Sequence, residues 1–193
     1  MFYRPKDGHG LPHNPFNALV TPRPVGWIST RGPLGDNLAP YSFFNAVAYV
    51  PPQVMFASTG VKDSLTNLRA AGVFAVNVVG EAALQAMSDT SEGFAPGTDE
   101  FVAVGVGKAD CLSIDCPRVA DAPAVLECVV TDIIALKGRD NFLIHGEVTG
   151  IHIADGCLVA GRFDPLRYRP VARMGYRDYT VVREVFELTR PDD

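Results

Sequence analysis

Residues 24–77 place the tightest limits on how this chain can fold. A strand-like run at 25–30 leads into a turn-rich connection at 31–37, and the chain returns as the apolar and aromatic run 38–45. Two such runs around a turn predict a β-hairpin. Because Pro40 cannot donate a hydrogen bond to a neighbouring strand, we expect the returning strand to be an edge or bulged strand.

The next part of this segment predicts a strand that turns into a helix. Residues 53–58 are apolar and fit a buried strand, Thr59 and Gly60 form a turn, and we expect a helix at 65–71. A helix N-terminus presents unpaired N–H groups and partial positive charge, so it favours an anion. We expect the Asp63 carboxylate to turn back and cap this helix. An ordinary strand–turn–helix connection explains these residues equally well.

Side chains around this corner suit a planar heterocycle that carries a phosphate tail. Lys62 adds a compact cation to the helix N-terminus. Tyr41, Phe43 and Phe44 could pack against the aromatic ring of a ligand, although aromatic residues in a strand are equally consistent with an ordinary hydrophobic core. Irregular backbone around Pro40 would leave N–H groups free to face a ligand.

The rest of the chain predicts mostly sheet. We expect strands at 73–79, 125–136 and 142–153, with a hairpin turn at 137–141 between the last two. A short helix is expected at 80–87, followed by a long polar loop at 88–98 that could be a lid or a dimer contact. An antiparallel barrel would hide most of the strand edges.

Composition indicates a globular protein and excludes some partners. Of the 193 residues, 47% are hydrophobic and 20% charged, and the net charge is −5. This charge argues against general binding of nucleic acid or of an anionic membrane. We find no signal-peptide pattern and no apolar run of membrane-spanning length, so we expect a cytoplasmic protein.

The sequence predicts no metal site. Cys111 and Cys116 are separated by four residues, unlike the two of a zinc or redox motif, so we expect reduced, partly buried thiols. His9 and His13 have no acidic or thiol partner near them in the sequence.

Several motifs, in order along the chain, resemble the flavin reductase-like family with the FMN-binding split β-barrel, which includes flavoredoxin-type members. The matching stretches are residues 23–30, 37–45, 62–67, 74–77, 146–148 and 170–175, followed by Tyr179. The resemblance implies a mainly β fold with short helices, an antiparallel split barrel. It also implies one flavin reductase-like domain over 1–193, with its core at about 20–180, and a homodimer.

The resemblance implies FMN as cofactor and NAD(P)H as electron donor. It places the phosphate on Ser58, Lys62 and Ser64, close to Thr59 and Asp63. The isoalloxazine and ribityl parts would contact Trp27, Ser29, Thr30, Tyr41, Ser42, Phe43 and Phe44, with Asn45 nearby. Arg173 is a candidate for stabilising negative charge on reduced flavin. No protein nucleophile or general acid is required, because the flavin carries the redox step.

A histidine and a glutamate share one face of a predicted strand. His145, Glu147 and Thr149 follow the two-residue period, and a His–Glu pair suggests proton handling or a nicotinamide contact. Ordinary polar residues on a half-exposed strand explain the same pattern.

Three functions remain open at this point. The first is an NAD(P)H:FMN oxidoreductase, a flavin reductase that could supply a separate monooxygenase. The second is a flavoredoxin-like electron carrier that retains FMN and exchanges electrons with a protein partner. The third is a non-redox split-barrel module that binds another ligand.

Overall fold

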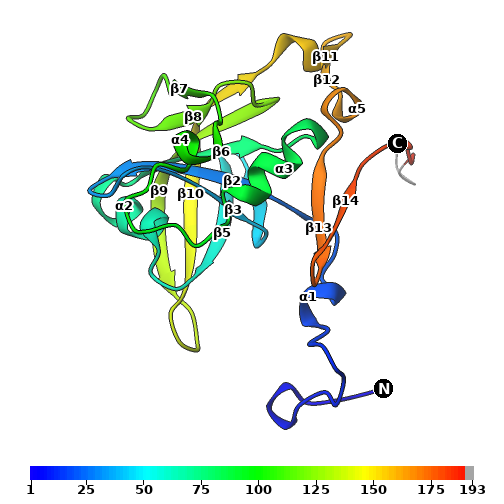
Figure 1. Cartoon of the computed structure of the whole chain (residues 1–193). Coiled ribbons are helices and arrows are strands. Elements are labelled where there is room, and N and C mark those ends of the chain that lie inside the picture. The colour runs from blue at the N-terminus through cyan, green and yellow to red at the C-terminus, as the bar shows by residue number, and fades with distance from the viewer. Residues whose placement is uncertain (190–193) are drawn as a thin grey trace.

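A seven-stranded antiparallel sheet forms the body of the molecule (Figure 1). The computed structural model describes residues 1–189. The strands lie in the order β3-β2-β6-β9-β10-β5-β4. Their bounds are β2 Gly26–Gly32, β3 Gly35–Tyr41, β4 Phe44–Tyr49, β5 Pro52–Thr59, β6 Val73–Val78, β9 Ala124–Ala135 and β10 Asn141–Ile153. The prediction of a mainly β, antiparallel fold is confirmed.

The two edge strands of this sheet follow each other in sequence. Strands β3 and β4 lie at opposite ends of the strand order, yet only Ser42 and Phe43 separate them. The sheet must therefore curl until its edges approach, without a ladder between them. Pro40 lies in edge strand β3, as predicted, but the run 38–45 is broken into two strands rather than one.

Short helices lie in the connections between the strands. Helix α2 (Asp63–Ala71) ends at Gly72, whose φ of 69° is left-handed. The predicted helix at 80–87 is η2 (Glu81–Ala83) followed by α3 (Leu84–Asp89), and α4 (Glu100–Val104) was not predicted. The remaining elements are η1 Pro5–Asp7, α1 Phe16–Leu19, β7 Lys108–Asp110, β8 Pro117–Val119, η3 Asp155–Cys157, β11 Leu158–Val159, β12 Arg162–Phe163 and α5 Pro165–Tyr168. Within residues 1–189, no helix is both long and apolar enough to cross a bilayer.

Helix α2 also holds the tip of the first hairpin. The Asn67 side chain accepts from the backbone N–H of Leu34 (3.1 Å) and donates to the Gly35 carbonyl (2.9 Å) and to the Thr30 hydroxyl (3.2 Å). A Cβ atom on Gly32 would lie 2.8 Å from the Asn67 backbone, so glycine permits this close approach. Asn67 therefore fixes the corner between hairpin and helix.

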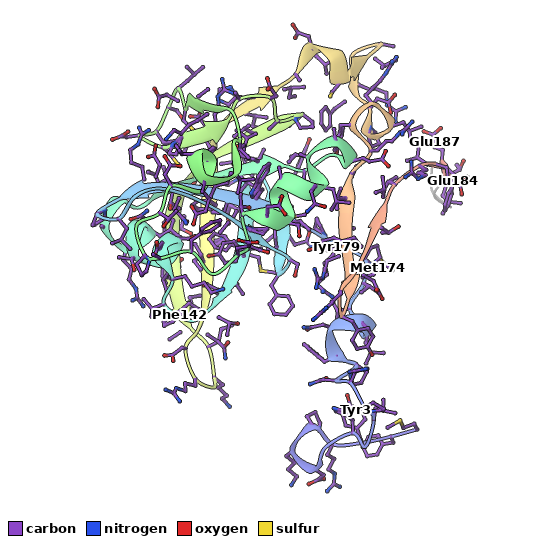
Figure 2. The ribbon with its side chains drawn as sticks, in the orientation of Figure 1. Tyr3, Phe142, Met174, Tyr179, Glu184 and Glu187 are labelled. Atoms are coloured by element: carbon purple, nitrogen blue, oxygen red, sulfur yellow. The ribbon has the colours of Figure 1, made fainter. Side chains whose placement is uncertain are left out.

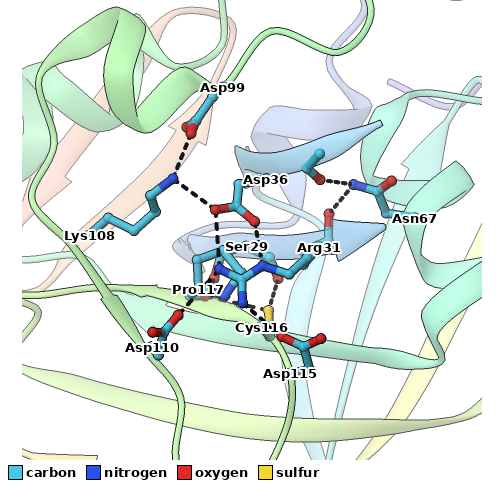
Figure 3. Close-up of polar contacts among 12 residues, drawn as sticks. Ser29, Arg31, Asp36, Asn67, Asp99, Lys108, Asp110, Asp115, Cys116 and Pro117 are labelled. Carbon is cyan, nitrogen blue, oxygen red and sulfur yellow. Dashed lines mark hydrogen bonds and ion pairs between the residues drawn. The ribbon is translucent and has the colours of Figure 1, made fainter. Parts of the chain in front are cut away.

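A network of charges ties the other side of this hairpin to β7 and α4 (Figure 3). Lys108 Nζ lies 2.8 Å from Asp36 and 2.6 Å from Asp99, and Arg31 Nε lies 2.7 Å from Asp36. Arg31 also pairs with Asp115 at 2.7 Å. Linked pairs of this kind contribute more than isolated surface pairs, because each charge has several partners.

A small sheet stands beside the barrel as an arm (Figure 1). Strands β1 (Arg23–Pro24), β13 (Val171–Gly175) and β14 (Asp178–Val181) form it, and α1 lies at its end. Gly175 has a φ of 117°, and a Cβ atom there would lie 2.7 Å from Ala18 Cα. Glycine is thus required where α1 packs on the arm.

A buried carboxylate holds the 111–116 segment against the barrel. Glu127 on β9 is 1% exposed, and it accepts from the N–H groups of Leu112 (2.7 Å) and Ser113 (2.6 Å) and from the Ser113 hydroxyl. His152 Nε2 lies 2.5 Å from the same carboxylate. Burial alone would raise the pKa of Glu127, but the Ser113 hydroxyl, His152 and the backbone donors outweigh burial and lower it to about 2.

This arrangement predicts acid-sensitive stability. A carboxylate with a depressed pKa in the folded protein stabilises it fully above the unfolded value of 4.5, and the contribution is lost as the pH falls toward 2. Glu127→Gln should lower the free energy of unfolding by about 3 kcal/mol at pH 7. Urea unfolding at pH 7, 5, 4 and 3 should show the difference from wild type shrinking below pH 4.5. Exposed Glu184→Gln is the control, and a difference that is constant down to pH 3 would contradict the assignment.

Candidate functional site

A cavity of about 540 Å³ lies where β5 turns into α2. One wall comes from β3 and the residues after it, including Tyr41 and Phe43, and a second comes from the corner residues Thr59 to Ser64. The loop that contains Thr90 and Pro96 forms a third wall. This volume lies in the range of small-molecule and cofactor sites.

The N-terminus of α2 opens on this cavity. Lys62 precedes the helix with extended backbone, and no side chain caps the first turn. The first backbone N–H groups of the helix are therefore free of intrahelical partners. Lys62 and Ser64 both line the cavity, so a cation and unpaired donors meet there.

The prediction that Asp63 caps this helix is wrong. Its Oδ2 accepts from the backbone N–H of Gly97 at 2.7 Å instead. Asp63 is the first helical residue rather than the N-cap, so its carboxylate is badly placed to reach back to the first turn.

The loop at 88–98 is fastened at both ends. Thr90 accepts from the indole N–H of Trp27 at 2.9 Å and donates to the Met87 carbonyl at 2.8 Å. At the other end Asp63 holds Gly97. The loop thereby closes one side of the cavity, and its role as a lid or a dimer contact stays a prediction.

A chain of buried hydrogen bonds forms the cavity floor. Glu100 accepts from Asn37 Nδ2 (2.9 and 3.0 Å) and from the backbone N–H of Leu38 (2.8 Å). Asn37 Oδ1 accepts from the Ser64 hydroxyl at 2.5 Å. Burial raises the pKa of Glu100, against the effect of these donors. The sequence analysis missed Glu100: Asp99 before an apolar run could have marked a helix start, but nothing signalled a buried glutamate.

The Tyr41 hydroxyl is the one side-chain oxygen, within residues 1–189, that is buried without a hydrogen-bond partner. Tyr41 lines the cavity and is 7% exposed. Burial raises its pKa, and the neighbouring Ser64 and Ser58 hydroxyls oppose that rise. A buried hydroxyl without a partner costs about 1–3 kcal/mol. A ligand with a polar group at this point would remove that cost.

Comparison with known proteins shows the family. The model of the flavin reductase like domain matches residues 19–170. The chain belongs to the flavin reductase-like family. An uncharacterized protein of Deinococcus radiodurans is 37% identical over 187 residues, which cover 90% of this chain and 82% of that protein.

Several solved structures have the same fold as this chain. Nitrilotriacetate monooxygenase component B from Bacillus cereus is 26% identical, with a TM-score of 0.90 over 97% of this chain and 98% of that chain. The 2-nitrobenzoate 2-nitroreductase NbaA of Pseudomonas fluorescens is 28% identical, with a TM-score of 0.81 over 91% and 88%. Flavoredoxin of Desulfovibrio vulgaris (Miyazaki F) has a TM-score of 0.81 over 89% and 93%, and at 17% identity it supports the fold alone. The predicted family and split-barrel fold are confirmed.

The structure of this flavin reductase-like protein divides the predicted flavin contacts into two groups. The residues that line the cavity are Tyr41, Ser42, Phe43, Thr59, Lys62, Asp63 and Ser64. Those that lie outside its lining are Trp27, Ser29, Thr30, Phe44, Asn45, Ser58 and Arg173.

Strand β2 accounts for three of the residues outside the lining. Trp27, Ser29 and Thr30 are at most 1% exposed. Trp27 bonds to Thr90, and Ser29 donates to the Pro117 carbonyl at 2.6 Å. Strand β2 lies between β3 and β6 with both faces covered, so these side chains serve the core and the loops rather than the cavity.

Other predicted residues have local partners. Ser58 donates to the Gly60 carbonyl at 3.2 Å, and Asn45 accepts from the N–H of Ala46 at 2.9 Å. Phe44 packs against the core of the barrel. His145 lies on β10, 2.8 Å from the Thr131 hydroxyl, and it too is outside the cavity lining.

The free Tyr41 hydroxyl predicts an unusual response to mutation. Tyr41→Phe should leave the ligand-free protein more stable by about 1 kcal/mol, because it removes a buried hydroxyl that has no partner. Urea unfolding of ligand-free protein measures this, with Tyr176→Phe at a 50% exposed position as the neutral control. A loss of stability of 1 kcal/mol or more would mean that the hydroxyl has a partner in the free protein.

Proposed function

We propose that this protein is an NAD(P)H-dependent oxidoreductase that binds FMN in the cavity between β3, β5 and α2. The observation that carries the proposal is the buried Tyr41 hydroxyl, which has no partner and lines a cavity beside a free helix N-terminus. Membership of the flavin reductase-like family supports a flavin as the ligand. When bound, the flavin would accept a hydride from the nicotinamide and pass the electrons on.

The phosphate would lie at the start of α2. Lys62 supplies the charge, and the first N–H groups of the helix supply donors. The Thr59 hydroxyl lies on the same corner. Ser64 gives its proton to Asn37, so it offers this ligand a lone pair rather than a donor. The phosphate role therefore rests on Lys62 and the backbone more than on the serines.

Charges around the cavity favour release of the reduced flavin. Asp63, Glu92 and Glu100 line it together with one cation, Lys62. An excess of carboxylates disfavours further negative charge on a bound group. We therefore expect the oxidised form of the flavin to bind more tightly than the more anionic reduced form. This favours a reductase that supplies flavin over a carrier that retains it.

Exposed apolar surface supports a homodimer. Val47 and Tyr49 on edge strand β4 are 46% and 90% exposed. Unpaired edges of this kind are normally covered. Since the Bacillus cereus neighbour is named as component B of a monooxygenase, we also propose a separate monooxygenase as the consumer of reduced flavin.

Two measurements test the proposed reaction. The absorbance spectrum of the purified protein, recorded before and after titration with FMN, should show bound flavin. A protein that does not bind FMN would contradict the proposal. In anaerobic stopped flow, NADH or NADPH should bleach the flavin directly. Bleaching that requires a reduced protein donor would instead indicate the flavoredoxin-like carrier.

Removing the charge of Lys62 tests the phosphate position. Lys62→Ala should weaken FMN binding by about 1.5–3 kcal/mol, the usual size of a charge-assisted hydrogen bond. Riboflavin, which lacks the phosphate, should bind the variant and the wild type almost equally. Fluorescence quenching of both ligands measures this, with Lys6→Ala at an exposed position of η1 as control. Equal losses for FMN and riboflavin would place the phosphate elsewhere.

A further inference from the structure

Two arginines lie side by side on the arm. In the pairing of β1 with β13, Arg23 is directly opposite Arg173. Residues in such a position have their side chains on the same face of the sheet, with Cβ atoms about 5 Å apart. Burial, and after it the positive charge of Arg173, lowers the pKa of Arg23. The two guanidinium groups therefore affect each other.

Neither arginine pairs with a carboxylate of residues 1–189. The chain carries 22 acidic residues against 17 basic ones, so acids are plentiful. Other arginines, such as Arg31 and Arg169, form ion pairs with carboxylates. Two like charges that face each other without an acid are expected to bind an anion from outside.

Arg23 has a guanidinium edge that is unpaired and buried in the ligand-free protein. Arg23 is 8% exposed, and its Nη1 donates to the carbonyls of Asn17 and Val20. Its Nε is buried and has no partner within the described chain. In an arginine, Nε and the neighbouring terminal nitrogen form the planar fork that binds carboxylate or phosphate through two bonds.

Arg173 is held in place beside this edge. It donates from Nη2 to the Tyr176 carbonyl, and its guanidinium lies 4.4 Å from the centre of the Tyr179 ring. Figure 2 shows Tyr179 on the arm, across from the barrel. A guanidinium fixed by an aromatic face and a carbonyl loses little freedom when it binds.

The arginine pair lies next to the cavity. The Arg23 guanidinium is 5.6 Å from the centre of the Phe43 ring, and Phe43 lines the cavity. Phe43 therefore lies close to Arg23 and also lines the space proposed for flavin. A molecule at this pair could reach the flavin with its other end.

We propose that Arg23 and Arg173 form the subsite for the diphosphate of the nicotinamide donor. This inference rests on the proposed function. A diphosphate carries the two negative charges that match two guanidinium groups, and the FMN phosphate already has Lys62 and the α2 N-terminus. The arginine pair would hold the anionic part of the dinucleotide while its nicotinamide reaches past Phe43.

The test uses ADP-ribose, which has the diphosphate but no nicotinamide, and isothermal titration of the FMN-loaded protein. Arg173→Gln should weaken ADP-ribose binding about tenfold, the lower end of the range for one charge-assisted hydrogen bond. Arg177→Gln, an exposed change of the same charge on the same arm, should have no effect. Arg173→Lys should recover part of the affinity, because it restores the charge without the fork.

A kinetic comparison separates the subsite from a structural role. With NADH, Arg173→Gln should raise KM about tenfold, whereas the KM for 1-benzyl-1,4-dihydronicotinamide, which has no phosphate, should stay unchanged. Equal losses with both donors would overturn the subsite. So would unchanged ADP-ribose binding, even if FMN binds normally and the proposed function stands. If Arg173→Gln weakened FMN and spared ADP-ribose, the pair would hold the flavin phosphate instead.

Discussion

The connection between β3 and β4 constrains the rest of the structure. Two residues, Ser42 and Phe43, join strands at opposite ends of the sheet, so the sheet has to curl. Pro40 on one edge cannot donate to a ladder, which helps to keep the two edges apart. The gap that results is flanked by the corner of β5 and α2, and this is where the cavity lies. Phe43 is placed at its wall for the same reason.

Several polar side chains around the cavity are held by hydrogen bonds within the protein. Glu100 fixes the orientation of the Asn37 amide, and Asn37 in turn takes the Ser64 proton. Asp63 is occupied by the Gly97 N–H, so its charge is turned toward the loop at 88–98. The buried Tyr41 hydroxyl has no such partner within residues 1–189. A ligand in the cavity can therefore contact that hydroxyl, Lys62 and the helix N-terminus.

Features of the fold that depend on local sequence patterns were predicted correctly. The long hairpin was expected at 125–136 and 142–153, and β9 and β10 are Ala124–Ala135 and Asn141–Ile153. Pro40 marked an edge because a missing donor is a local property. Asp63 was misassigned because its partner, Gly97, lies 34 residues away.

The candidate site was harder to predict. A strand that is buried on both faces shows no alternation of polar and apolar residues, so the sequence does not tell which side chains face a ligand. Trp27, Ser29 and Thr30 look like a polar strand with one aromatic, yet β2 is enclosed by its neighbours and by the loops above it. Glu100 was missed for a related reason, since a glutamate beside an aspartate looks like solvated surface. Arg173 was singled out by the resemblance alone. Its relation to Arg23 depends on a pairing between strands almost 150 residues apart, which only the fold brings together.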